Sequence, residues 1–407
     1  MNTIKQLLDK YCPDGVEYKK LGEVCAIKGR IGFRGYTRAD LVNKGEGAIS
    51  LSPSNIINGR IKYSKCSYIS WKKYYESPEI MIENGDVIFC KTASVGKTCI
   101  INELPDKATI NPQLVVFKDI KINHKYLSYY VSGSDFQKRI IKIRGLGSIP
   151  TLSQKDLAEQ IIPVPPLSVQ REIVRILDNF TSLEAELEAE LEARRKQYEY
   201  YRDQLLSFKH LSAGGKNKVE WKTLGEIGEV CMCKRIMKNQ TNAEGCIPFY
   251  KIGTFGKKAD AFISEELYEE YKQKYSFPRK GEVLISAAGT IGRAVIYDGE
   301  PAYFQDSNIV WIANDESLVL NKYLYYFYSV ADWRLEGGTI KRLYNNNLKA
   351  VRIPLPPLST QRRIVSILDR FESLVNDIST GLPAEIAARH QQYEYYRDQL
   401  LSFKRKS

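Results

Sequence analysis

The sequence contains few of the residues from which catalytic and metal sites are commonly built. Only three histidines occur among 407 residues, at positions 124, 210 and 390, which argues against a histidine-based triad or metal centre. Cys231 and Cys233 are the only close pair among the eight cysteines, and no further cysteine or histidine stands at ligand spacing. We therefore expect structural cysteines, no metal site and a reducing compartment, the cytoplasm.

Membrane and export signals are also missing. No apolar run approaches the roughly 18 residues that a membrane span needs. The start, Met-Asn-Thr-Ile-Lys-Gln, lacks the pattern of a signal peptide. We expect a cytoplasmic protein without a membrane partner.

Three stretches resemble cofactor-binding or catalytic motifs without completing them. Ser94 to Thr98 reads like the tail of a phosphate-binding loop, but Lys91 stands where that loop requires glycine. The glycines between Gly29 and Gly35 lack the strand-to-helix setting of a dinucleotide or methyl-donor site. Asn111-Pro-Gln-Leu is not the Asn-Pro-Pro-aromatic signature of amino-methyltransferases. The sequence thus offers no catalytic constellation, and we expect this chain to bind no cofactor.

Basic residues exceed acidic ones. Sixty Lys and Arg against 48 Asp and Glu leave a formal charge of +12, which suits a polyanion such as nucleic acid. An anionic membrane surface or simple solubility would explain the same charge. The 27 tyrosines fit nucleic acid as well, because their rings stack on bases, although packing accounts for most of them.

The strongest pattern is an internal repeat. Residues 197–209 recur letter for letter at 392–404, and Ile-Pro-Val-Pro-Pro-Leu-Ser at 162–168 matches Ile-Pro-Leu-Pro-Pro-Leu-Ser at 353–359. Both proline motifs continue into Gln-Arg-x-Ile-Val-x-Ile-Leu-Asp-x-Phe. Two copies of this length indicate a duplicated domain plus helix rather than a solenoid.

A globular domain precedes each of the two helical repeats. Short β-branched runs punctuated by Gly, Asn and Pro predict a mixed domain over 1–160, and 216–350 repeats its landmarks with little identity. Helical regions occupy 161–215 and 351–407. The fold class is therefore α+β, with two similar mixed domains separated by two long helices. Because the helical repeats are nearly identical, we expect both helices to have the same function. Because the globular domains share little sequence, we expect each of them to have a different one.

Each helix carries a heptad seam and is predicted to begin at an N-cap serine, Ser168 or Ser359. We expect a break near Pro383. The heptad pattern alone allows the two helices to pack either parallel or antiparallel. If the two copies of the duplicated unit are related by a pseudo-two-fold axis, the helices form an antiparallel coiled coil, which we favour. The seam residues, which we expect to form the spacer and to dock partners, are Ile173, Leu177, Phe180, Leu187, Leu191, Tyr198, Tyr201, Leu205 and Phe208, then Ile364, Leu368, Phe371, Val375, Ile378, Leu382, Ile386, Tyr393, Tyr396, Leu400 and Phe403.

The two chain ends are expected to be neighbours. Leu7-Leu8 ahead of Val16-Glu-Tyr resembles Leu205-Leu206 ahead of Val219-Glu-Trp, as though the chain began where its last helix ends.

Basic and hydroxyl side chains recur at matching places in the two globular domains. Such groups suit phosphate contacts and base edges, although any one of them alone is adequately explained as a solvated surface residue. The candidate DNA-binding residues are Lys28, Arg30, Arg34, Arg38, Lys91, Thr92, Ser94, Lys97, Arg139, Lys142 and Arg144 in the first domain, and Lys234, Arg235, Lys238, Ser286, Thr290, Arg293, Arg334, Lys341 and Arg342 in the second.

The whole chain resembles the specificity subunit of a type I restriction-modification system. The resemblance rests on the domain–helix–domain–helix order, the Ile-Pro-x-Pro-Pro-Leu start of each helix and its Gln-Tyr-Glu-Tyr-Tyr-Arg-Asp-Gln-Leu-Leu end. It implies a non-catalytic subunit in which each globular domain, a target-recognition domain, reads one half of a bipartite asymmetric site on double-stranded DNA. The helices would set the gap and dock two methyltransferase subunits, and restriction subunits would join that complex. S-adenosylmethionine, ATP and magnesium would then belong to those partners.

Two other classes of protein remain open from the residues. An enzyme with unrecognised motifs would bind nucleotide or methyl donor, or modify DNA unaided. A duplicated coiled-coil scaffold without sequence preference would bind DNA as charge and salt dictate.

Overall fold

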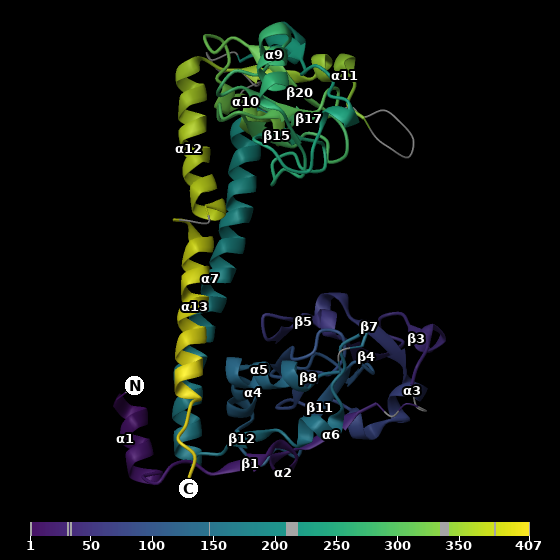
Figure 1. Cartoon of the computed structure of the whole chain (residues 1–407), viewed down its shortest axis with the longest axis vertical. Coiled ribbons are helices and arrows are strands. Elements are labelled where there is room, and N and C mark those ends of the chain that lie inside the picture. The colour runs from purple at the N-terminus through teal and green to yellow at the C-terminus, as the bar shows by residue number, and fades with distance from the viewer. Residues whose placement is uncertain are drawn as a thin grey trace. The chain divides into compact units, whose positions relative to one another are not determined.

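The structure is a computed structural model that describes residues 2–30, 32, 35–145, 147–208, 219–333, 342–377 and 380–406. The chain divides into two compact units (Figure 1): unit 1 draws on residues 1–187 and 386–407, and unit 2 on residues 188–385. Each unit contains one globular domain, part of the long helix α7 (Leu167–Ser207) and part of the C-terminal helical segment. No helix within the described ranges combines the length and apolar character needed to cross a membrane.

Two four-stranded sheets form the globular domain of unit 1. One is antiparallel with the order β2-β11-β8-β9, and the other has the order β10-β4-β7-β3, in which β10 and β4 run parallel. Their strands are β2 (Ala26–Gly29), β3 (Leu41–Val42), β4 (Gly47–Leu51), β7 (Ser67–Ser70), β8 (Val87–Cys90), β9 (Thr98–Ile100), β10 (Ala108–Ile110) and β11 (Leu114–Lys118). Two-stranded pairs join β1 (Tyr18–Lys20) to β12 (Ile161–Pro163) and β5 (Ile56–Ile57) to β6 (Arg60–Ile61).

The pleat of β8 and β11 divides this domain into two cores, because successive side chains point to opposite faces. Phe89 and Phe117 pack with α4 (His124–Ser132), α5 (Ser134–Ile143) and the start of α7. Ile88 and Val116 pack against the sheet that contains β4 and β10. The remaining helices of the unit are α1 (Asn2–Tyr11), α2 (Leu21–Val24), α3 (Trp71–Tyr75) and α6 (Gln154–Ala158).

Unit 2 repeats this plan. An antiparallel sheet with the order β14-β20-β17-β18 packs on a three-stranded sheet with the order β16-β15-β19, in which β15 and β19 are parallel. Its strands are β13 (Glu220–Thr223), β14 (Gly228–Cys231), β15 (Ile247–Tyr250), β16 (Phe262–Ile263), β17 (Val283–Ser286), β18 (Ala294–Ile296), β19 (Tyr303–Phe304), β20 (Ile309–Asn314) and β21 (Arg352–Leu355). Its helices are α8 (Leu224–Ile227), α9 (Glu265–Lys274), α10 (Asn321–Tyr328) and α11 (Asn345–Ala350). The predicted fold class, with two similar mixed domains and long helices, is confirmed.

The predicted N-cap serines are wrong. α7 begins at Leu167 and α12 at Leu358, so Ser168 and Ser359 already lie inside the first turn. Pro357 occupies the N-cap of α12, where no side chain caps the helix. The Pro357 carbonyl accepts from the Thr360 and Gln361 amides at 2.8 and 3.0 Å, so the first helical turn starts from the second proline of the pair.

The C-terminal helical segment breaks near Pro383, as predicted, and the break precedes the proline. α12 (Leu358–Asn376) ends before α13 (Leu382–Leu400), and Pro383 falls in the first turn of α13, where it disrupts no helical hydrogen bond. A Cβ on Gly381 would lie 2.4 Å from the Ser373 carbonyl oxygen, so only glycine fits this return of the chain.

The helices pack antiparallel within each unit, as predicted. In unit 1 Phe180 stacks on Tyr396 and Glu184 contacts His390, so rising numbers on α7 meet falling numbers on α13. In unit 2 Tyr201 stacks on Phe371, and Leu206 joins a buried cluster with Ile364.

The seam residues are largely covered. Every described seam residue is buried or half-buried except Tyr201, which is 41% exposed. Ile378 lies outside the described residues. These buried side chains hold the two helical segments together, as a spacer requires. Most of them leave little accessible surface for another protein.

The N-terminal and C-terminal segments meet within unit 1, as predicted. The Val16 amide donates to the Lys404 carbonyl at 2.8 Å, and the Lys406 amide donates to the Val16 carbonyl at 2.9 Å. Gly15 has a φ of +104°, and a Cβ there would lie 2.8 Å from the Arg405 carbonyl carbon. Glycine at this position therefore permits the close approach.

Candidate nucleic-acid interface

One edge of the globular domain in unit 1 gathers the ends of several strands. β4 and β10 are parallel and end together, while β2 and β8 end where their antiparallel neighbour β11 begins. The Asn111 amide donates to the Leu51 carbonyl at 2.8 Å, and the Lys91 amide donates to the Gln113 carbonyl at 2.9 Å. We call residues Arg30, 91–97, 111–113, 144–145 and 147–152 edge 1. Many of the candidate DNA-binding residues of the first domain lie on it.

A tight turn of edge 1 presents polar side chains. The Cys90 amide donates to the Lys97 carbonyl at 2.8 Å and the Gly96 amide to the Cys90 carbonyl at 3.0 Å. Gln137 supports the turn from α5, since its Nε2 donates to the Gly96 carbonyl at 2.9 Å. Ser94 and Lys97 are exposed on this hydrogen-bonded turn.

Lys91 follows this strand end and is half-buried. Burial lowers the pKa of its ammonium group from the ordinary lysine value. A cation that is poorly solvated gains more from an anionic ligand than one already surrounded by water. Lys91 is therefore well suited to meet a phosphate.

The same edge recurs in unit 2. The Ser286 amide donates to the Arg293 carbonyl at 2.9 Å, and the Ala287 amide donates to the Asn308 carbonyl at 2.8 Å, which reproduce the bonds of Cys90 and Lys91. The Leu343 amide donates to the Ala287 carbonyl at 2.9 Å, as that of Leu152 does to Lys91 at 2.8 Å. We call residues 234–235, 250–252, 286–293, 305–308 and 342–343 edge 2. The two turns therefore correspond residue by residue, with Ser286 at the place of Cys90 and Arg293 at the place of Lys97.

Several candidate residues stabilise their own domain. Arg30 is only 5% exposed, and its guanidinium donates to the Ile110 carbonyl at 3.4 Å and to Thr109 Oγ1 at 3.3 Å; burial lowers its pKa. Ser286 is 2% exposed and accepts from the Arg293 amide at 3.0 Å, and its hydroxyl donates to the Thr290 carbonyl. Both side chains shape the edges instead of lying open to a ligand.

Three other arginines are also engaged. Arg139 donates to the Ile161 carbonyl at 2.9 Å and to the Tyr130 hydroxyl at 2.8 Å. Arg293 donates to the Phe255 carbonyl at 2.9 Å, and Arg235 pairs with Asp306 at 2.9 Å. Arg235 is nevertheless exposed.

The other candidates are more open. Ser94, Lys97 and Thr290 lie exposed on the two turns, Arg342 is exposed on edge 2, and Thr92 and Arg144 are half-buried on edge 1. Lys234 is exposed on edge 2, with its ammonium 5.1 Å from the Tyr275 ring centroid. Lys28, Arg38, Lys142 and Lys238 are exposed away from the turns. Arg34, Arg334 and Lys341 lie outside the described residues.

Sequence reasoning missed the amide side chains of both edges. Asn111 Nδ2 donates to Gln113 Oε1 at 3.1 Å on edge 1, and Gln305 Oε1 accepts from the Ile252 amide at 2.9 Å on edge 2. Asn and Gln pair with the donor and acceptor of an adenine edge. The available signal was an amide-rich stretch immediately before a buried strand, here Leu114–Lys118 or Ile309–Asn314.

Polar contacts fix each domain on its own helix. Asp178 accepts from Lys125 Nζ at 2.7 Å and from the Tyr129 hydroxyl at 2.7 Å. In unit 2 Asp369 accepts from Lys322 Nζ at 3.0 Å and from the Tyr326 hydroxyl. The repeated Ile-Leu-Asp motif thus attaches a tyrosine-rich helix in both units.

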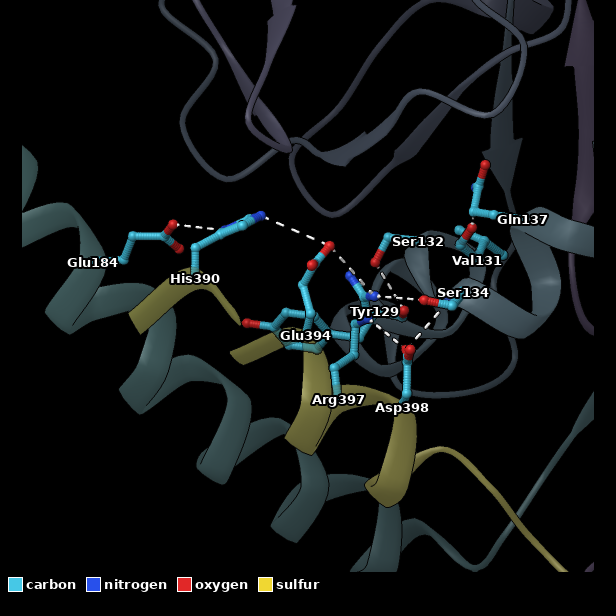
Figure 2. Close-up of polar contacts among 10 residues, drawn as sticks. All are labelled: Tyr129, Val131, Ser132, Ser134, Gln137, Glu184, His390, Glu394, Arg397 and Asp398. Carbon is cyan, nitrogen blue, oxygen red and sulfur yellow. Dashed lines mark hydrogen bonds and ion pairs between the residues drawn. The ribbon is translucent and has the colours of Figure 1, made fainter. Parts of the chain in front are cut away.

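A second network holds α13 in unit 1 (Figure 2). His390 Nδ1 lies 2.8 Å from Glu184 Oε1 on α7 and its Nε2 lies 3.7 Å from Glu394. At the start of α5, Arg397 donates to Ser134 Oγ at 3.3 Å and Asp398 accepts from the Ser134 amide at 3.2 Å. These contacts join the end of the repeat to the globular domain of the same unit.

No group of three or more His, Cys, Asp or Glu side chains within the described ranges could hold a metal ion. The arrangement instead offers two rigid edges of basic, hydroxyl and amide groups, which is the chemistry of nucleic-acid recognition.

Comparison with known proteins agrees with this class of protein. The family model described as "Type I restriction modification DNA specificity domain" matches residues 13–193 and 216–388. The chain therefore belongs to the family of type I restriction-modification specificity proteins. The specificity subunit is the non-catalytic member of such a system, and the catalytic activities lie in partner subunits. The resemblance predicted from the repeats is confirmed.

Two relatives and one solved structure illustrate the similarity. A putative type I restriction enzyme specificity subunit of Haemophilus influenzae is 56% identical over 300 residues, covering 70% of this chain and 73% of the relative. The specificity subunit of the Escherichia coli enzyme EcoR124I/EcoR124II is 36% identical over 267 residues, covering 60% and 64%. A chain from a study of complex assembly and conformational transition of the type I R-M system has a TM-score of 0.59 at 20% identity, covering 95% of this chain and 97% of that one. This last likeness supports the fold alone.

Proposed function

We propose that each globular domain reads one half of a bipartite, asymmetric DNA site, with edge 1 and edge 2 as the reading surfaces. The observation that carries the proposal is the repetition of one backbone frame with different side chains. Edge 1 carries Lys91, Ser94 and Gln113 at the positions where edge 2 carries Ala287, which is buried, Thr290 and Asn308. A shared frame holds the side chains in comparable positions, and their differences would select different bases.

The helices act as the spacer between the half-sites. Two half-sites read by one molecule must lie on about the same face of the duplex, roughly 34 Å apart for one turn. α7 has 41 residues and is continuous, so it is a stiff element of about 60 Å at 1.5 Å per residue.

The same helices dock two methyltransferase subunits, and restriction subunits join through that complex. S-adenosylmethionine, ATP and magnesium are bound by those partners, and this chain contributes the sequence specificity. The protein acts in the cytoplasm, where these partners and DNA are found together.

A domain exchange tests this function. Residues 1–160 are replaced by the corresponding domain of a family member that directs methylation to a different, known sequence, and the complex is assayed for the DNA sequence it methylates. One half of the target should change while the other half stays the same. A target that changes in both halves, or in neither, would contradict the division of labour between the domains.

A further inference from the structure

One isoleucine of edge 1 takes no part in the packing of its own domain. Ile149 is 60% exposed, the highest value of any isoleucine or leucine in the part of the chain that the structure describes. No buried apolar cluster among the described residues of unit 1 includes it. Single exposed apolar residues are common on protein surfaces, so the position of Ile149 matters more than its exposure.

The backbone that follows Ile149 is hydrogen-bonded to the turn of edge 1. The Pro150 carbonyl accepts from the Ala93 amide at 2.9 Å, and the Leu152 amide donates to the Lys91 carbonyl at 2.8 Å. Leu152 is 1% exposed and belongs to the buried cluster that includes residues of α4 and α5. The loop that carries Ile149 is therefore attached both to the core and to the turn that we propose reads DNA.

The Ile149 side chain has few conformations to lose on binding. Isoleucine is branched at Cβ, which restricts its χ1 angle. The following residue, Pro150, disfavours the helical region for the backbone of Ile149 and leaves it an extended conformation. A side chain that is already ordered binds a ligand at a smaller entropic cost.

Edge 1 is otherwise polar. Ser94, Lys97 and Ser148 are exposed on it, and Lys91 is half-buried. Such cations and hydroxyls suit phosphates and those base atoms that donate or accept hydrogen bonds, whereas an isoleucine suits neither. In the major groove, the apolar group that a base pair presents is the C5-methyl group of thymine. An exposed and ordered isoleucine matches that group.

We infer that Ile149 contacts the C5-methyl group of one thymine in the half-site read by the first domain. This inference rests on the proposed function, in which edge 1 reads DNA, and it names an apolar determinant of that reading. The contact favours thymine over cytosine, which has no methyl group at C5. The chemistry recognised is that of a 5-methylpyrimidine in the major groove.

The test uses the complete methyltransferase complex assembled on the full chain, with duplexes that contain its methylation site. Each thymine of the half-site assigned to residues 1–160 is replaced in turn by uracil, which lacks the methyl group but pairs with adenine in the same way. Fluorescence anisotropy measures Kd for each duplex. Duplexes with uracil only outside the site are the nucleic-acid control.

One replacement within the half-site should raise Kd about fourfold, the factor expected when one methyl group is no longer buried. Uracil outside the site should leave Kd unchanged. This result requires no substitution in the protein, so it does not depend on the folding of a variant.

Protein variants then assign the methyl contact to Ile149. The fourfold difference between thymine and uracil should vanish in Ile149→Ala and persist in Ile149→Val, which keeps the branched Cβ. Leu41→Ala is the matched control and should keep the difference. Leu41 is also an exposed aliphatic residue, at 39%, but it lies in β3 beside the start of β4, whereas edge 1 lies at the end of β4.

Three results would overturn the inference. If no uracil replacement changes Kd although exchanged base pairs in this half-site do, no methyl group is read and the proposed function stands. If Ile149→Ala keeps the fourfold difference, another side chain reads the methyl group. If exchanged base pairs in this half-site also leave Kd unchanged, the proposed function fails together with the inference.

Discussion

Gln170 joins the long helix to the globular domain of unit 1 through Asn123. Its amide oxygen accepts from the Asn123 backbone amide at 2.8 Å, and its Nε2 donates to the Pro165 carbonyl at 2.7 Å. Gln361 makes the same two bonds in unit 2, with the Leu320 amide at 3.0 Å and the Pro356 carbonyl at 3.0 Å. The glutamine of the repeated Gln-Arg-x-Ile motif therefore fixes each domain to its helix.

Gln170→Ala should destabilise the chain. Gln170 is 3% exposed, so the substitution leaves a buried amide and a buried carbonyl without their partner. Each buried polar group without a partner destabilises the fold by about 1–3 kcal/mol, so we expect the free energy of unfolding to fall by about 2 kcal/mol or more. Denaturant unfolding of the full chain measures it. Gln204→Ala, at an exposed position of the same helix, should change stability by less than about 0.5 kcal/mol; equal losses would show that the buried bonds are not important.

Gly15→Ala should loosen the contact between the two chain ends. The substitution forces a non-glycine residue to a φ of +104° and brings its Cβ to 2.8 Å from Arg405. Hydrogen exchange at the Val16 and Lys406 amides should become faster. Gly59→Ala is the matched control, since Gly59 also has a positive φ, +69°, but nothing lies within 4 Å of its Cβ. Unchanged exchange in Gly15→Ala would contradict the close approach.

The architecture could be predicted from the sequence because the heptad spacing of apolar residues repeats along both helical segments. The repeats revealed the duplication, and every seam residue that the structure describes, from Ile173 to Phe403, is buried or half-buried apart from Tyr201. The helix starts were misplaced, since a serine after Pro-Pro resembles an N-cap while the prolines begin the helix without a capping side chain.

The candidate site was predictable only in part, because exposure depends on long-range packing. Arg30 and Lys97 look alike in sequence as basic residues near glycine. Arg30 is buried against Ile110, 80 residues away, whereas Lys97 lies open on a turn. Asn111 and Gln113 became candidates only once β4, β10 and β11 were seen to meet at one edge.

Lys97→Ala should weaken DNA binding without changing the sequence preference. A lysine on the exposed turn of edge 1 is expected to contact phosphate, so its loss weakens binding to all sequences and lowers the salt slope by about 1. Binding of the assembled complex to specific and unrelated duplexes at several salt concentrations measures both. Lys44→Ala is the control, because Lys44 is exposed before the start of β4, at the opposite end of that strand.

Gln113→Ala should instead relax one base position. An amide that reads a base edge contributes about 1–3 kcal/mol of discrimination. Binding to a panel of duplexes that vary one position at a time would show one position losing its preference. A uniform loss over all duplexes would mean that Gln113 supports the edge but does not read a base.

Acid should weaken the attachment of α13 in unit 1. Although burial alone would raise the pKa of Asp398, hydrogen bonds from the Ser134 hydroxyl and amide and the charge of Arg397 outweigh it and lower that pKa. A carboxyl with a lowered folded pKa stabilises the fold above its unfolded value of about 3.9, and this contribution is lost as the pH falls through the folded pKa. The stability difference between the unsubstituted chain and Asp398→Asn should therefore shrink below about pH 4. A difference that stays constant from neutral to acid pH would contradict this role.

The most direct measurement is methylation mapping of DNA from cells that make this chain, the methyltransferase subunit, or both. Single-molecule sequencing reports methylated adenines and their flanking sequence. The account predicts a split, asymmetric motif that is present only when both proteins are made. Methylation by this chain alone, or a motif that is the same with and without it, would contradict its assignment as the subunit that supplies the sequence specificity.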